Sequence, residues 1–242
     1  MKKPTAALIV ALAAGLGLIN AANADDRAWP WSPIGIGIAA PAQLPFMSSD
    51  VYGLRFGGFL GYNNDVYGLD AGVAELSTGD FAGIQAAGFT WTEGSAYGIQ
   101  AGLLANVIGE NSIAADVGFA NVVWGEGAGA QIGVVNYANS FAGLQAGAIV
   151  NWNNAPSYGV EASLVNGNQD EFCGLSIGAL VNYSDKQTGF QLGLVNVAYD
   201  ARGYQLGLVN ACETMHGVQV GLVNLICKSP RLPIMVLANA CF

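Results

Sequence analysis

One short segment recurs along most of this sequence and limits its possible folds more than any other feature. The three clearest copies, GFQLGLVN, GYQLGLVN and GVQVGLVN, begin at Gly189, Gly203 and Gly217 and therefore lie 14 residues apart. About twelve copies can be recognised at a spacing near 15 residues, and they diverge toward the N-terminus. A unit this short cannot bury a core of its own, so neighbouring units must stack. We therefore expect residues 51–242 to form one repeat domain.

Apolar residues alternate with small or polar residues inside each unit, which is the period of a β-strand. In the copy that begins at Gly189, Phe190, Leu192 and Leu194 share one face, whereas Gln191 lies on the other face between two glycines. The chain is therefore expected to be all-β, with an apolar face and a polar face in every strand. The middle of the polar face is formed by these residues: Arg55, Asp70, Gln85, Gln100, Asp116, Gln131, Gln145, Glu161, Gln191, Gln205 and Gln219.

Two architectures repeat a strand every 14 to 15 residues. In an antiparallel transmembrane β-barrel of short-looped strands, the leucine face would meet lipid and the glutamine face would line a lumen. In a β-solenoid of 14–15-residue coils, the leucine face would form a dry core and the glutamines would face outward. The near-uniform unit favours the solenoid, because a meander should alternate long and short loops. Asparagines that end the last units could also stack into a ladder, namely Asn182, Asn196, Asn210 and Asn224.

Three observations favour the barrel. Only 10% of the residues are charged, whereas a soluble domain has about 25%, so much of the surface must avoid water. The ten steps from Tyr52 to Tyr62 span roughly 33 Å, enough for a tilted strand with aromatic ends to cross an apolar band of about 25 Å. An opening strand at Ile34–Ala40 and a last strand at Leu232–Phe242 bring the count to about 14, and bacterial barrels use even numbers. We therefore predict a barrel of about 14 strands, with the solenoid as the alternative.

Residues 1–24 have the features of a signal peptide. An uncharged apolar run at 6–19 follows two lysines, and the Ala-Asn-Ala sequence at 22–24 matches the small-x-small cleavage pattern. We therefore expect export of the chain. Residues 25–50 would then form an N-terminal segment that contains the opening strand.

Residues suited to catalysis or metal binding are scarce. His216 is the only histidine and no Cys-x-x-Cys pair is present, so neither a Ser-His-Asp triad nor a zinc site is indicated. A formal net charge of −9 disfavours binding to the phosphates of nucleic acid. We expect no enzymatic activity and no cofactor. Disulfides could form after export, but the pairing is left open among Cys173, Cys212, Cys227 and Cys241.

The glutamine face is the functional surface that remains. In the barrel it would line a passive, porin-like channel for small polar solutes, with Arg55, Asp70, Asp116 and Glu161 as its main charges. In the solenoid it would form a flat outer sheet. The protein would then act as a non-enzymatic adhesion or structural interaction module at the cell surface.

The motif GLQxGLVN resembles that of a bacterial family of surface-repeat proteins found in spirochaetes and other Gram-negative bacteria. The resemblance covers Val51–Phe242, although the units from Gly53 to Gly88 lack the final asparagine. The last strand, which ends at Phe242, also resembles the C-terminal signal by which outer-membrane assembly machinery recognises its substrates. Together the resemblances imply an outer-membrane, cell-surface location with membrane lipid and that machinery as partners. They imply no activity and no oligomeric state.

Overall fold

The computed structural model describes residues 30–40, 42–229 and 233–242, so the predicted signal peptide lies outside the described residues. The described residues are mostly in β-strands, which confirms the all-β prediction. This part of the chain contains no helix with the length and hydrophobicity needed to cross a bilayer. The strands are β1 (Trp31–Ala39), β2 (Ala42–Leu44), β3 (Asp50–Asn63), β4 (Val66–Ser77), β5 (Phe81–Thr92), β6 (Ala96–Ile108), β7 (Ser112–Asn153), β8 (Ser157–Leu206), β9 (Val209–Ile226) and β10 (Ile234–Cys241).

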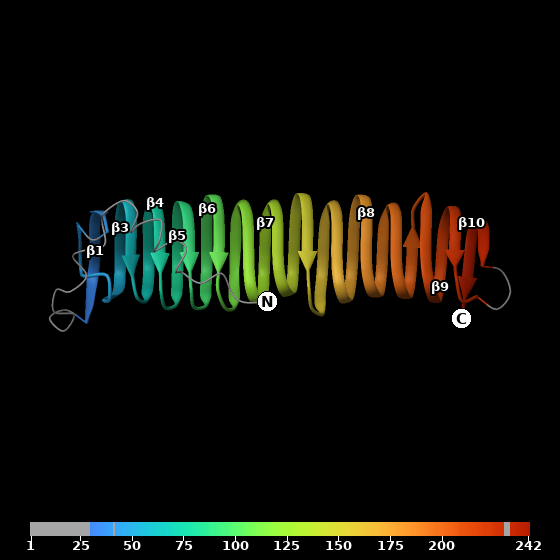
Figure 1. Ribbon diagram of the computed structural model, residues 1–242, viewed down its shortest axis with the longest axis horizontal. Coiled ribbons are helices and arrows are strands. Elements are labelled where there is room, and N and C mark those ends of the chain that lie inside the picture. The colour runs from blue at the N-terminus through green and yellow to red at the C-terminus, as the bar shows by residue number, and fades with distance from the viewer. Residues whose placement is uncertain (1–29, 41, 230–232) are drawn as a thin grey trace, which may run out of the picture. The chain divides into compact units, whose positions relative to one another are not determined.

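The chain divides into two compact units, unit 1 ending at Gly125 and unit 2 running from Glu126 to Phe242. In both units a coil of 14 to 16 residues pairs in parallel with the coil before it, so equivalent positions of successive repeats lie side by side. In unit 2, for example, Asn196 pairs with Asn210. Each unit is therefore a β-solenoid, and the described residues form about 13 turns in all (Figure 1).

These coils correct the predicted antiparallel barrel. β3 to β6 each pair in parallel with the next strand, as do β7 with β8 and β8 with β9. The described antiparallel pairs are β1 with β2 and β9 with β10. Each repeat bends through a complete turn, so the next repeat starts beside it and runs in the same direction. A meander, in contrast, would reverse at every unit. The expected opening and closing strands are present as β1 and β10.

The interior of the coils is polar, which also corrects the orientation expected for the solenoid alternative. Among the described residues, 36 buried side chains are polar or charged and 17 are apolar. Gln191 is 1% exposed, whereas its neighbours Leu192 and Leu194 are 46% and 45% exposed. The glutamines therefore point inward and the leucines point outward.

A column of asparagines makes this polar interior stable. In unit 2, Asn182 Nδ2 donates to Asn196 Oδ1 at 2.8 Å, Asn196 donates to Asn210 at 2.8 Å, and Asn210 donates to Asn224 at 2.8 Å. The second N–H of Asn196 donates to the Leu206 carbonyl of the next coil at 2.9 Å. Because the amide carries both donors and an acceptor, identical residues one coil apart satisfy one another. The asparagine ladder is thus confirmed.

A glycine opens most repeats because the backbones of adjacent coils come close there, and Ala114 takes this position in the coil that pairs with Gly98. Gly68 and Gly83 have φ values of 138° and 146°, which favour glycine. A Cβ atom on Gly83 would also clash with the carbonyl oxygen of Gly68. The regular spacing of these glycines along the sequence therefore follows from the close stacking of the coils.

The asparagine column predicts an unusual pattern of mutational sensitivity. Asn196→Ala leaves a donor of Asn182, the acceptor of Asn210 and the Leu206 carbonyl unpaired inside the coils. At about 1–3 kcal/mol for each such group, we expect the free energy of unfolding to fall by at least about 3 kcal/mol. Leu192→Ala, on the exposed face of the same coil, should change it by less than about 0.5 kcal/mol. Denaturant unfolding measures both, and equal losses would contradict a polar-core solenoid.

Candidate functional site

The eleven residues predicted on the polar face all point into the coils, and each is at most 3% exposed. Strand pairing aligns neighbours such as Gln85 and Gln100. Ser176 occupies the same position between Glu161 and Gln191 and is also buried. Sequence reasoning missed this serine, although it lies two residues after the glycine that opens its repeat. The column in unit 1 is Arg55, Asp70, Gln85, Gln100 and Asp116, and the column in unit 2 is Gln131, Gln145, Glu161, Ser176, Gln191, Gln205 and Gln219.

The glutamines of the column bond to one another. Gln205 Nε2 donates to Gln191 Oε1 at 2.7 Å, and Gln219 Nε2 donates to Gln205 Oε1 at 2.7 Å. The same contact joins Gln100 to Gln85 at 3.0 Å in unit 1. These amides therefore fill the interior that they were expected to line. The barrel and its lumen are wrong, and the porin-like prediction loses the structure on which it was based.

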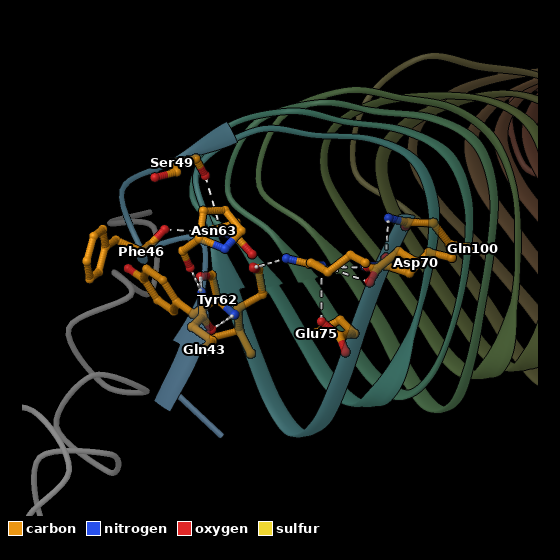
Figure 2. A network of polar contacts seen from close by, with 12 residues as sticks. Gln43, Phe46, Ser49, Tyr62, Asn63, Asp70, Glu75 and Gln100 are labelled. Carbon is orange, nitrogen blue, oxygen red and sulfur yellow. Dashed lines mark hydrogen bonds and ion pairs between the residues drawn. The ribbon is translucent and has the colours of Figure 1, made fainter. Parts of the chain in front are cut away.

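An ion cluster interrupts the amide column near the start of unit 1, and Figure 2 shows Asp70 and Glu75 within the coils. Arg55 donates from Nε to Asp70 Oδ1 at 2.7 Å and from Nη2 to Asp70 Oδ2 at 2.5 Å. Its Nη1 donates to the Leu76 carbonyl at 3.0 Å, and its Nε lies 3.2 Å from Glu75 Oε2. Gln85 donates to Asp70 at 2.5 Å and so joins the cluster to the amides. A bidentate Arg–carboxylate pair of this kind compensates a buried charge well.

Glu75 takes the position that asparagine has in the later repeats, and its carboxyl group is packed against glycines. A Cβ atom on Gly57, Gly61 or Gly72 would clash with its oxygens, so these glycines make room for it. Burial, followed by the charge of Asp70, raises the pKa of Glu75 to about 8. At neutral pH the carboxyl group is therefore mostly protonated. This leaves the arginine and Asp70 as a balanced pair.

Asp116 and Glu161 are buried acids without a basic partner among the described residues. Ser112 Oγ donates to Asp116 at 3.0 Å, and Ser176 Oγ donates to Glu161 at 2.6 Å. Asn168 also donates to Glu161, at 2.9 Å. Burial raises the pKa of Asp116 to about 6 and that of Glu161 to about 7, against the lowering effect of these donors. The interior thus contains acids that titrate near neutral pH.

The outside of the repeats carries a broad apolar face. Its side chains flank the glutamine position and continue to the asparagine position, and several are more exposed than half, such as Leu103 at 78% and Phe59 at 71%. A soluble monomer rarely exposes so extended an apolar surface. In unit 1 this apolar face is Leu54, Phe56, Phe59, Leu69, Val73, Ile84, Ile99, Leu103, Leu104, Val117 and Phe119. In unit 2 it is Ile132, Leu144, Ile149, Val160, Leu164, Leu180, Phe190, Leu192, Leu194, Leu208, Val209, Val220, Leu222 and Val223.

Two aromatic rows border the apolar face. The first row precedes the opening glycine of its repeats and comprises Tyr52, Tyr67, Tyr97 and Tyr158. The second row follows the asparagine position and comprises Tyr62, Trp91, Tyr137, Trp152 and Tyr183. Two polar atoms of the second row bond to turn residues: Trp152 Nε1 donates to Asn154 at 3.0 Å, and Tyr183 Oη donates to Asp185 at 2.6 Å. Each of these two rings therefore has an apolar side and a polar edge that meets the turn.

The turns between the two aromatic rows form an acidic strip. Every charged residue of the described repeats lies either inside the coils or on or beside these turns, so the apolar face carries no charge. The exposed side of each unit is thus divided into a charge-free region and a charged region. The charged residues of this turn strip are Asp50, Asp65, Asp80, Glu93, Glu110, Glu126, Asp170, Glu171, Asp185, Lys186, Asp200, Arg202, Glu213 and Lys228.

The histidine and the four cysteines are the remaining groups of chemical interest among the described residues. No group of three or more His, Cys, Asp or Glu side chains there is arranged to hold a metal ion. The four cysteines are free thiols, and burial raises the pKa of Cys212 to about 12. Cys241 packs against the apolar cluster that contains Cys212, and the Cys227 amide donates to the Cys212 carbonyl at 2.9 Å. His216 is exposed on a coil of β9.

Comparison with known proteins identifies no relative. Neither the protein-family models, nor the curated proteins, nor the solved structures contain a match to this chain. The resemblance to the surface-repeat family therefore stays a prediction, and the surfaces described above carry the functional inference.

The buried acids predict that stability falls as the pH rises. The pKa of Glu161 is about 7 in the folded chain against an ordinary value of 4.5, so the folded state holds this proton more tightly. The stabilisation is complete below pH 4.5 and is lost as the pH rises through about 7, a change of about 3 kcal/mol. Glu161→Gln keeps an acceptor for Ser176. Its free energy of unfolding should therefore fall less than that of the wild type between about pH 5 and pH 8.

Denaturant unfolding at the two pH values measures this difference. Glu110→Gln is the matched control, because Glu110 lies on the turn strip and its side chain is exposed. It should retain the full pH dependence of the wild type. Identical pH dependence in all three proteins would reject the titration of Glu161 as a cause.

Proposed function

We propose that this protein is a non-enzymatic module of the bacterial cell surface that binds a lipid bilayer through its apolar face. One observation carries the proposal: a charge-free apolar surface bordered by tyrosine on one side and by tyrosine and tryptophan on the other. Aromatic side chains with one apolar side and one polar edge prefer the boundary between acyl chains and water. The two aromatic rows, the first of which has Tyr158 as its one member in unit 2, would lie at this boundary, with the apolar face between them in contact with lipid.

The distribution of charge supports a lipid occupant over a protein one. A bilayer requires a surface without charge, whereas a protein interface is usually surrounded by a polar rim that pairs with the partner. The apolar face meets the first condition, and the acidic turn strip is separated from it by the aromatic rows. Bound in this way, each unit keeps its carboxylates in water and away from anionic headgroups. The coil axis of the unit would then run along the membrane plane.

The energetics also favour adsorption to a membrane. A half-exposed leucine that leaves water contributes about 1 kcal/mol, and the apolar face contains such residues in nearly every coil. Summed over the apolar face of a unit, this free energy exceeds the free energy that reversible membrane binding requires. The amide-filled interior offers no exposed reactive group, so the function resides in the outer surface. Export through the predicted signal peptide would bring this surface to the outer membrane.

Flotation with phosphatidylcholine and phosphatidylglycerol vesicles tests the proposal. The wild-type chain should float with the vesicles, and the fluorescence of its tryptophans, of which Trp91 and Trp152 lie in the second aromatic row, should shift to the blue and be quenched by brominated lipid. Leu164→Glu places a charge on the apolar face and should weaken partitioning at least about tenfold, since 1.4 kcal/mol corresponds to a factor of ten. Gln169→Glu adds the same charge to the turn strip of the same coil and should leave partitioning unchanged.

Three results would count against lipid binding. The first is wild-type protein that stays at the bottom of the gradient although it is folded by circular dichroism. The second is an equal effect of the two glutamate substitutions. The third is flotation without any change in tryptophan fluorescence, which would show that another part of the chain contacts the vesicle.

A further inference from the structure

The first two strands of unit 1, β1 and β2, form an N-terminal hairpin whose outer side is apolar. β1 pairs in parallel with β3 and antiparallel with β2. Ile36 is in register with Phe56 of β3 and with Leu44 of β2, and these side chains are 61%, 52% and 67% exposed. On β1, Ile34 and Ile38 are also exposed. Neither strand of the hairpin contains a charged residue, so the apolar face of unit 1 continues over it.

The inner side of the hairpin is already occupied by other side chains. A Cβ atom on Gly35 would come within 3.2 Å of Arg55 Cγ, and one on Gly37 would clash with Gln43. Gln43 donates to the Tyr62 carbonyl and accepts a hydrogen bond from the Tyr62 amide at 3.0 Å, as Figure 2 shows. A strand that slips by one residue turns every side chain to the other face. Because the inner side has no room for them, the isoleucines of β1 stay outside.

Trp31 extends the first aromatic row onto the hairpin. Its ring lies 6.3 Å from the ring of Tyr52 in an edge-to-face arrangement, and Tyr52 stacks on Tyr67 at 5.1 Å. Trp31 is 58% exposed, so it does not belong to a core. Tryptophan, like tyrosine, prefers the boundary between acyl chains and water. The boundary that this row marks in unit 1 therefore reaches β1.

We infer that the N-terminal hairpin anchors unit 1 in a lipid bilayer, with Trp31 at the boundary and the exposed side chains of β1 and β2 among the acyl chains. The inference rests on the proposed function and assigns an anchor to it. Ile38 and Leu44 are 71% and 67% exposed, so each would transfer a large apolar area out of water. The hairpin continues the apolar face, so one bilayer covers both surfaces without a second binding partner.

Titration of the full chain with phosphatidylcholine vesicles tests the anchor. Trp31→Ala should raise the lipid concentration at half-binding about tenfold, because the exposed indole area no longer leaves water. Tyr199→Ala is the matched control, because Tyr199 is also an exposed aromatic residue, at 54%, but lies beside Asp200 on the turn strip. It should change the half-binding concentration by less than about twofold. Ile36→Glu places a charge among the acyl chains and should weaken binding at least about tenfold.

Trp31→Phe separates contact with lipid from affinity. Phenylalanine keeps an apolar ring at this position, so the variant should still bind the vesicles. Quenching of tryptophan fluorescence by brominated lipid should then be weaker than in the wild type, because one of the rings in contact with lipid is missing. Quenching as strong as that of the wild type would place Trp31 outside the bilayer and overturn the inference.

The outcomes distinguish this inference from the proposed function. Wild-type protein that does not bind the vesicles would reject both. Wild-type protein that binds, together with Trp31→Ala and Ile36→Glu variants that bind equally well, would reject the anchor and leave the lipid-binding face in place. Light scattering that gives a wild-type dimer and a monomeric Ile36→Glu variant, with equal lipid binding, would assign the hairpin to a contact between copies and likewise overturn the inference.

Discussion

The hydrogen bond between identical amides in successive coils is the interaction on which this structure depends. A strand normally places its apolar residues inside because an unpaired polar group in the interior is costly. Asparagine avoids that cost when the residue above and the residue below are also asparagine, as in the contacts at 2.8 Å from Asn182 to Asn224. Once the interior is satisfied in this way, leucine and valine are left on the outside. The apolar face is thus a consequence of the amide columns.

The sequence predicted the strands, the two faces and the residues that share each face, but it did not predict which face is inside. A period of two divides side chains into two sets without saying which set meets solvent. The preference for an apolar interior favoured Leu192 and Leu194 as the core of a solenoid, and the structure reverses this because Gln191 and Asn196 bond to their own kind along the coils. The uniform repeat was the better guide to parallel coils. The low charge content, which favoured a barrel, is explained instead by the exposed apolar face.

The places where the amide pattern is interrupted show how local the compensation is. Asp116 and Glu161 stand where glutamine is expected, and each accepts a hydrogen bond from a serine at the position that the coil geometry supplies. Glu75 replaces an asparagine and fits only because neighbouring repeats have glycine beside it. Periodicity could locate these acids but could not reveal their partners, which depend on contacts between coils. Their pKa values are raised because the interior offers hydrogen-bond partners for amides but does not solvate a charged carboxylate.

The placement of amides inside the coils and apolar residues outside separates stability from function in this chain. In an ordinary solenoid the apolar residues hold the coils together, so they are not available for binding. Here the amides hold the coils together, and substitutions on the apolar face or the turn strip leave those bonds intact. A repeat of this design can therefore change what it binds without changing how it folds, provided that the glycine, glutamine and asparagine positions are kept.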